Sequence, residues 1–131
     1  MIGLDTNVVV RYLTQDDPKQ AALANRVIER ELTENRPGFL GIIVLVETVS
    51  VLRRLYAVRS EEIHEMVAGL LGSPAIVIEN RAVVAAALAR ARQQACDFAD
   101  AIIASTAAAA GCEQVMTFDR RAARAGMTLL E

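Results

Sequence analysis

The sequence is poor in the residues that disulfide frameworks require. It contains two cysteines, Cys96 and Cys112, and no CxxC motif. They flank a predicted helix of about 15 residues, whose rise holds them roughly 20 Å or more apart, whereas the Cα atoms of a disulfide lie within about 7 Å. We therefore expect free thiols, which fit the reducing cytoplasm.

Long apolar runs are also missing. The most apolar stretch, Phe39 to Leu52, spans about 14 residues and contains Glu47, so it is too short and too polar to cross a bilayer. The first residues show no charged region followed by an apolar stretch, so we expect no signal peptide. Linkers, low-complexity tracts and repeats are absent, and 53% of the residues are hydrophobic, which predicts a single domain over residues 1–131 with a real core.

No charge of one sign dominates, since 14 basic residues face 16 acidic ones and the net charge is −2. This balance argues against a general nucleic-acid coat protein, which would be strongly basic. Lys19 is the only lysine, so the basic residues are otherwise arginines. Arginine suits forked contacts to phosphate and carboxylate, although an arginine-rich composition is also typical of high-GC genomes.

The sequence does contain apolar strands that alternate with helices. The predicted strands are residues 2–4, 39–43, 75–78, 115–118 and 127–130; the predicted helices are residues 6–34 with a break near 16–18, 44–58, one opening at 60, 80–95, 97–110 and a short one from 119. This alternation predicts a three-layer α/β/α fold around a parallel sheet of about five strands. Ligands of such sheets bind beyond the carboxyl ends of the strands.

Five acidic residues map to that edge of the predicted sheet. Asp5 ends the first strand, and Asp119 follows the fourth. Glu47 lies in the first turns of the helix that leaves the second strand, and Asp97 and Asp100 begin the helix that leads into the fourth. Helices that run antiparallel to their strands start at the carboxyl edge, so residues far apart in the chain are expected to meet there.

Each of these acids also has a structural explanation. Asp97, Asp100 and Asp119 stand where helix N-caps and first turns favour a carboxylate. Glu47 has apolar neighbours, so we expect it to be buried, and a buried carboxylate needs a partner. Arg53 or Arg54 would serve as that partner, and Asp5 has the same ambiguity.

The complete set favours a metal site. Two carboxylates about 4 Å apart repel by roughly 4 kcal/mol at an effective dielectric near 20, so a cluster of four persists only by holding protons or binding cations. Oxygen ligands without histidine or cysteine suit Mg²⁺ or Mn²⁺. Such a site activates water and neutralises charge on a phosphodiester, which predicts phosphodiester hydrolysis.

At these residues the sequence resembles the PIN domain, and specifically the VapC-type toxins of bacterial toxin–antitoxin pairs, over nearly the whole chain. The matching segments are Ile2-Gly3-Leu4-Asp5-Thr6-Asn7, Glu47 in its apolar helix, Asp97-Phe98-Ala99-Asp100-Ala101-Ile102-Ile103-Ala104 and Thr117-Phe118-Asp119. Their order and spacing, more than any single segment, carry the resemblance.

The resemblance implies a ribonuclease with an acidic pocket for one or two Mg²⁺ or Mn²⁺ ions. The implied ligands are Asp5, Glu47, Asp100 and Asp119, with Asp97 as an auxiliary ligand or a plain N-cap. Asp100 is preferred to Asp97 because it directly precedes the Ala-Ile-Ile-Ala run. Thr6, Asn7 and Thr117 match polar positions that orient ligands or water in such sites.

The resemblance also implies partners. These are an RNA substrate, an antitoxin of the VapB type whose C-terminal segment covers the pocket, and a second copy of the chain in a homodimer. A basic side chain of the antitoxin would reach the acids and replace the charge of the metal. Arg11, Arg120, Arg121 and Arg124 are candidates for RNA phosphate contacts, with a solvated helix face as the alternative.

The residues argue against two other functions and leave a third open. A receiver-like domain needs an aspartate after the third strand and a lysine near the last one, but position 79 is Glu and the only lysine is Lys19. A haloacid-dehalogenase-type phosphatase needs an aspartate two residues after Asp5, where Asn7 stands. A catalytically silent PIN-like module that binds an antitoxin or RNA stays open.

Overall fold

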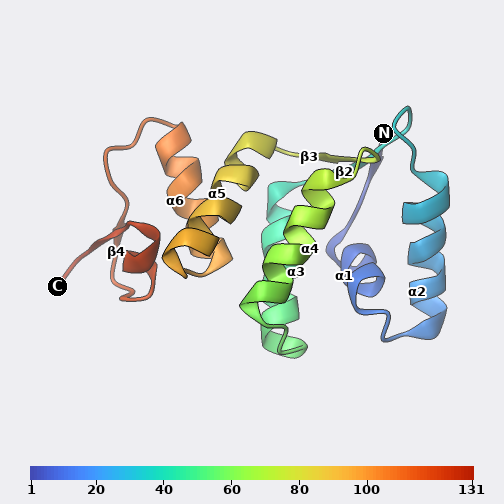
Figure 1. The fold of residues 1–131 in the computed structure, drawn as a ribbon, viewed down its shortest axis with the longest axis horizontal. Coiled ribbons are helices and arrows are strands. Elements are labelled where there is room, and N and C mark those ends of the chain that lie inside the picture. The colour runs from blue at the N-terminus through green and yellow to red at the C-terminus, as the bar shows by residue number, and fades with distance from the viewer. The chain divides into compact units, whose positions relative to one another are not determined.

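The computed structural model describes every residue from 1 to 131. The chain forms two compact units, Met1–Glu79 and Asn80–Glu131, called the N-terminal and C-terminal units below (Figure 1). Each unit combines helices with parallel strands, which confirms the predicted α/β class. The single domain over residues 1–131 stays a prediction.

Three parallel strands run through the N-terminal unit. Its elements are β1 (Ile2–Gly3), α1 (Thr6–Thr14), α2 (Pro18–Asn25), the π-helical turn η1 (Arg26–Glu31), β2 (Gly38–Leu40), α3 (Ile42–Leu55), α4 (Ser60–Gly72) and β3 (Ile76–Ile78). The strand order is β1-β2-β3, and the register pairs Ile2 with Gly38 and Phe39 with Val77. Because all three strands are parallel, their carboxyl ends share one edge of the sheet.

Local sequence signals explain where the first helices begin. Asp5 has extended backbone angles and directly precedes α1, at the N-cap position. The Asp17 carboxylate accepts a hydrogen bond from the backbone N–H of Gln20, and Pro18 occupies the first position of α2. An aspartate followed by proline is a strong helix start, so the predicted break near residues 16–18 is confirmed.

The boundary between β2 and α3 differs from the prediction of a strand over residues 39–43. The strand ends at Leu40, and the helix already begins at Ile42. The side chain of Glu79, at the end of β3, accepts a hydrogen bond of 2.9 Å from the backbone N–H of Ile42. This contact satisfies a free N–H group of the first helical turn. Because Glu79 is far from Ile42 in the sequence, no local pattern predicts it.

The core of the N-terminal unit consists of aliphatic side chains from its strands and helices. Leu40, Leu45, Leu52 and Ile63 are each at most 1% exposed. A Cβ at Gly38 in β2 would lie 2.7 Å from Leu32 Cδ1, so a larger residue there would require the end of the Leu32 side chain to shift. Pairing with β1 on one side and β3 on the other places β2 in the middle of the sheet.

The C-terminal unit carries two further parallel strands. Its elements are α5 (Arg81–Gln94), α6 (Phe98–Ala109), β4 (Met116–Thr117), the 3₁₀ turn η2 (Ala122–Ala125) and β5 (Thr128–Leu129). The five strands expected from the sequence are therefore present and all paired in parallel, with three in one sheet and two in another. The helix predicted to start at Asp119 begins instead at Ala122.

Helices α5 and α6 pack closely against each other. Ala87 and Ala91 of α5 and Ala101 of α6 are completely buried, because small side chains allow two helix backbones to approach. Cys96 and Cys112 are free thiols, as predicted. None of the helices combines the length and the apolar character that crossing a lipid bilayer requires.

Candidate active site

Asp5 follows β1 at the carboxyl edge of the sheet, as predicted. Its backbone carbonyl accepts hydrogen bonds from the N–H groups of Val8 and Val9 and so starts α1. Its side chain makes no capping hydrogen bond and is exposed. Helix capping therefore does not account for the carboxylate of Asp5, and neither does an ion pair with an arginine.

Glu47 lies in the second turn of α3, and its carboxylate accepts a hydrogen bond from the Thr6 hydroxyl. Thr6 is only 5% exposed, so its side chain is held firmly beside Asp5. The prediction that Glu47 is buried is wrong, because the side chain is exposed. Arg54, one of the partners considered for it, donates to Ser50 instead.

The helical period explains this exposure. Glu47 and Arg54 are exposed, and Ile43 is 80% exposed, so they mark the solvent-facing stripe of α3. Thr48 and Leu52 on the opposite side are each 1% exposed. The apolar neighbours of Glu47 in the sequence therefore point mainly into the core, while its own side chain does not.

In the C-terminal unit the fold brings Asp97, Asp100 and Asp119 into electrostatic contact. Burial raises the pKa of the Asp100 carboxyl, and the charges of Asp97 and Asp119 raise it further. Two carboxylates near a third make its charged form unfavourable unless a cation compensates.

Asp97 is the N-cap of α6. Its side chain accepts hydrogen bonds from the backbone N–H groups of Ala99, at 2.7 Å, and Asp100, at 3.3 Å. The plain N-cap, which was one of the two interpretations of Asp97, thus describes its geometry. Phe98, which follows it, is 1% exposed and anchors the first turn of the helix in the core.

Asp119 is fixed by a short loop after β4. Its backbone N–H donates to the Thr117 hydroxyl at 3.0 Å, and its carboxylate accepts from the backbone N–H of Arg121 at 2.8 Å. The Arg90 guanidinium of α5 donates to the carbonyl of Ala125 at 2.9 Å. Arg90 therefore ties α5 to η2, the turn that follows Asp119, a contact that the sequence alone did not indicate.

Beside Glu47, which accepts from the Thr6 hydroxyl, the four aspartates fall into two groups by their hydrogen bonds. The carboxylates of Asp97 and Asp119 accept backbone N–H groups, so a capping role explains part of their placement. Those of Asp5 and Asp100 accept no hydrogen bond and form no ion pair. Capping therefore explains only some of the acids, and these two carboxylates are available to a ligand.

Neither unit by itself gathers three histidine, cysteine, aspartate or glutamate side chains closely enough to hold one ion. The N-terminal unit contributes Asp5 and the Thr6–Glu47 pair, and the C-terminal unit contributes the three interacting aspartates. The four-carboxylate site expected from the sequence combines residues of both units and stays a prediction. Its donor set contains only hard oxygen atoms, which fit Mg²⁺ or Mn²⁺.

Arg11 is occupied by contacts inside the N-terminal unit. Its guanidinium donates to Gln20 at 2.7 Å and to the Tyr56 hydroxyl at 2.9 Å, and it pairs with Asp16 at 3.4 Å. Tyr56 in turn donates to Asp16 at 2.7 Å. This network joins α1 to α2 and to the end of α3, so Arg11 has a structural role, and its predicted RNA contact stays untested.

The other predicted basic residues lie close to Asp119 in the chain. Arg120, Arg121 and Arg124 are all exposed, and none of them forms an ion pair within the C-terminal unit. Their guanidinium groups are therefore available to an anion. Exposed arginines of this kind suit the phosphates of a nucleic acid.

Asn7, the remaining predicted site residue, is exposed and lines a groove of about 300 Å³ between α1 and α2. The groove walls are mainly apolar, and Leu23 on its rim is 57% exposed. The complete lining is Asn7, Val8, Arg11, Gln20, Leu23, Ala24 and Val27. Asn7 therefore lies at this apolar groove and only two residues after Asp5 in the chain.

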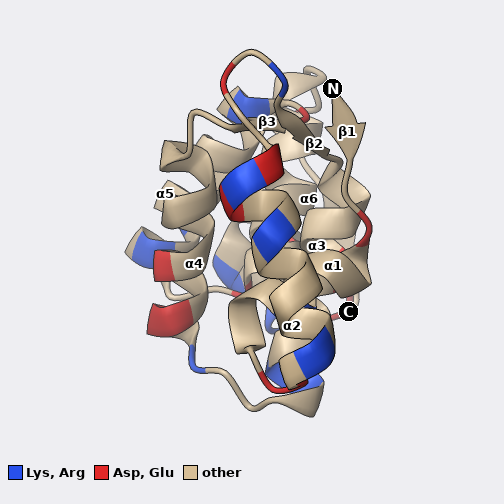
Figure 2. Ribbon diagram, turned by 90° about the vertical axis from the view of Figure 1, so that its right-hand side faces the viewer, with Lys and Arg blue, Asp and Glu red and all other residues tan.

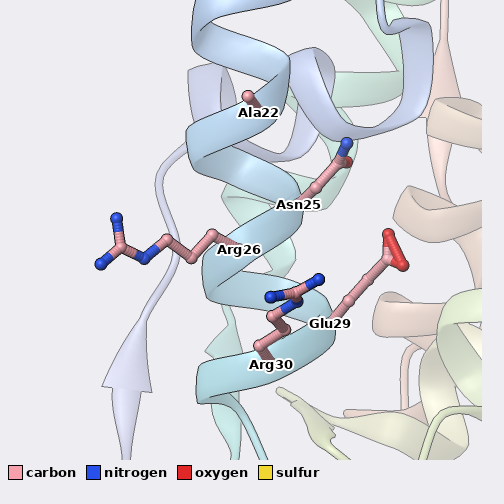
Figure 3. Close-up of a pocket in the computed structure, with 5 residues that line it drawn as sticks. All are labelled: Ala22, Asn25, Arg26, Glu29 and Arg30. Atoms are coloured by element: carbon pink, nitrogen blue, oxygen red, sulfur yellow. The ribbon is translucent and has the colours of Figure 1, made fainter.

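A second hollow, of about 450 Å³, lies along α2 and η1 and is lined by Ala22, Asn25, Arg26, Glu29 and Arg30. Figure 3 shows Arg26 pointing away from the side on which Asn25 and Glu29 lie. Arg26 is also paired with Glu31 at 3.8 Å, and basic and acidic segments alternate here in Figure 2. The two arginines do not converge on one point, so this hollow is no phosphate clamp.

Glu79 is the residue of this region that the sequence reasoning missed. From the sequence, Glu79 served only to exclude a receiver-like domain. In the structure its carboxylate holds the first N–H of α3, the helix that carries Glu47. The signal that was available is its position, directly after a strand at the carboxyl edge of the sheet.

Residues 2–127 match the PIN domain family. No curated protein matches the chain. The family match extends over both units and includes the positions of all predicted site residues.

Proposed function

The chain belongs to the PIN domain family, and on that premise we propose that it is a metal-dependent endoribonuclease that hydrolyses RNA phosphodiester bonds. PIN domains are generally nucleases. The observation that carries the proposal is the state of Asp5 and Asp100. Both lie in segments that carry the resemblance to the family, and both carboxylates lack any structural partner.

The residues present fit a hard divalent cation. The proposed ligands are Asp5, Glu47, Asp100 and Asp119, with Asp97 as an auxiliary group. The raised pKa of Asp100 reflects its burial and the repulsion of its neighbours, and a bound cation would relieve that repulsion. When bound, Mg²⁺ or Mn²⁺ would supply an activated water and neutralise charge on the phosphate.

The protein's own part in this chemistry is to hold the carboxylates in place. The Thr6 hydroxyl fixes one oxygen of Glu47, and the Thr117 hydroxyl fixes the backbone that presents Asp119. Asn7, two residues after Asp5 in the chain, is proposed to orient a ligand or metal-bound water. Such supporting hydrogen bonds determine how well a carboxylate cluster is preorganised.

We further propose that the chain is the toxin of a VapBC-like pair that acts in the cytoplasm. The mainly apolar groove between α1 and α2, with the exposed Leu23, supports a protein partner. An apolar segment of the antitoxin would fill the groove and place a basic side chain near Asp5. We also propose that the chain forms a homodimer.

The test is to induce the chain in bacteria beside its Asp5→Ala variant and to map new 5′-phosphate RNA ends across the transcriptome. One or a few sharp sites, seen only with the unmodified chain, are expected. If both proteins are soluble and folded and no new ends appear, the nuclease is excluded under these conditions and the silent binding module takes its place.

A further inference from the structure

Phe118 stands out among the aromatic residues of the C-terminal unit because it is 81% exposed. Phe98, in the same unit, is 1% exposed and has the ordinary place of a phenylalanine. Single exposed apolar residues are common on protein surfaces. Phe118, however, lies between Thr117 and Asp119, two residues of the proposed site.

The backbone around Phe118 is well fixed. The hydrogen bond from the Asp119 N–H to the Thr117 hydroxyl spans Phe118, and the bond from the Arg121 N–H to the Asp119 carboxylate fixes the residues that follow. Met116 of the preceding strand β4 is also exposed, at 58%. The loop therefore presents the Phe118 ring to solvent on a fixed backbone.

The charged residues that follow Phe118 in the chain indicate what binds to its ring. Arg120, Arg121 and Arg124 are exposed and form no ion pair within the C-terminal unit. The same surface on a second copy would bring like charges together, which disfavours self-association. A polyanion with flat apolar faces satisfies both features, and unpaired RNA is such a molecule.

We infer that Phe118 is a stacking platform for an unpaired base of the RNA substrate, next to the phosphate that is cleaved. The inference rests on the proposed ribonuclease function, because it takes Asp119 as a neighbour of the reacting phosphate. The base lies on the ring, and the arginines contact the flanking phosphates. The base must be unpaired and accessible to the ring, since bases inside a duplex offer no free face.

The test compares variants of position 118 in an Asp5→Ala background, which is expected to bind RNA without cutting it. The probe is a fluorescein-labelled single-stranded RNA of about 12 nucleotides, measured by fluorescence anisotropy. Phe118→Ala is expected to weaken binding roughly 5- to 150-fold, the range for the loss of one stacked base. Phe118→Leu, the matched apolar control, is expected to weaken it similarly, whereas Phe118→Trp is expected to retain it.

Cleavage by the protein with Asp5 intact, in Mg²⁺, separates the two claims. If the parent cuts RNA and Phe118→Ala neither weakens binding nor raises KM, the platform is wrong while the nuclease stands. If binding depends on an aromatic residue but the parent cuts no RNA, the platform stands and the nuclease fails. If Phe118→Leu binds as tightly as the parent, or if Phe118→Ala instead changes the oligomeric state, stacking is excluded.

Discussion

At the scale of single residues, a buried hydroxyl determines how Glu47 is held. Replacing Thr6 by Val keeps the shape of the side chain but removes the donor to the Glu47 carboxylate. We expect the Mg²⁺ concentration for half-maximal RNA cleavage to rise by roughly 10- to 100-fold, the usual effect of losing a hydrogen bond to a metal ligand. Magnesium titrations of cleavage measure it.

The control for this variant is Thr6→Ser, which keeps the hydroxyl and should retain most of the parent's magnesium affinity. The melting temperatures of both variants should stay near that of the parent, because Val fills the space of Thr. An unchanged magnesium dependence in Thr6→Val would show that this hydrogen bond has no part in metal binding.

Asp100 provides a prediction about pH. Its pKa is higher in the folded chain than in the unfolded chain, so the folded state binds the proton more tightly. The stability gained from this protonation is present at low pH and is lost as the pH rises through the folded pKa. At neutral pH without metal, the charged carboxylate therefore destabilises the fold.

Asp100→Asn should accordingly raise the melting temperature of the metal-free protein at neutral pH, and the gain should shrink as the medium is acidified below the ordinary pKa of a carboxyl. Thermal denaturation in EDTA over a pH series measures this. A variant that melts lower than the parent at neutral pH would show that Asp100 makes favourable contacts that the repulsion does not outweigh.

At the scale of elements, α3 depends on a residue from a distant strand. Glu79 accepts the N–H of Ile42, so Glu79→Ala leaves this N–H without its partner in the first turn of α3. The loss should cost about 1 kcal/mol, as for other side chains that cap a helix, with urea denaturation as the measurement. Glu79→Gln retains an acceptor oxygen and should lose less, and equal losses in the two variants would contradict the hydrogen-bond account.

The same contact shows what the sequence could and could not predict. The starts of α1 and α2 follow from signals within a few residues, namely Asp5 after an apolar strand and the Asp17-Pro18 pair. The start of α3 does not, because it depends on Glu79, far along the chain. The exposure of Glu47 could have been predicted from the sequence, because the helical period places it on the same stripe as Ile43 and Arg54.

At the scale of the whole molecule, the positions of the acidic residues could be predicted mainly from the topology. Parallel strands with intervening helices place Asp5, the start of α3 and Glu79 at one edge of the N-terminal sheet. In the C-terminal unit they place Asp119 near Asp97 and Asp100. Side-chain partnerships were less predictable: Arg11 is held by Tyr56 and Asp16, a network that joins segments distant in the sequence.

If the acids of both units hold one catalytic cation site, removing one ligand disables the site, and removing a second adds little. Asp5→Ala and Asp100→Ala take one ligand from each unit. Their effects should therefore be strongly non-additive.

The most direct test measures cleavage of single-stranded RNA in Mg²⁺ and in EDTA by the parent, the two single variants and the double variant. The parent is expected to cleave RNA in Mg²⁺ and not in EDTA. Each single variant is expected to cleave no faster than the double variant. Cleavage that persists in EDTA, or at the parental rate in either single variant, would contradict it.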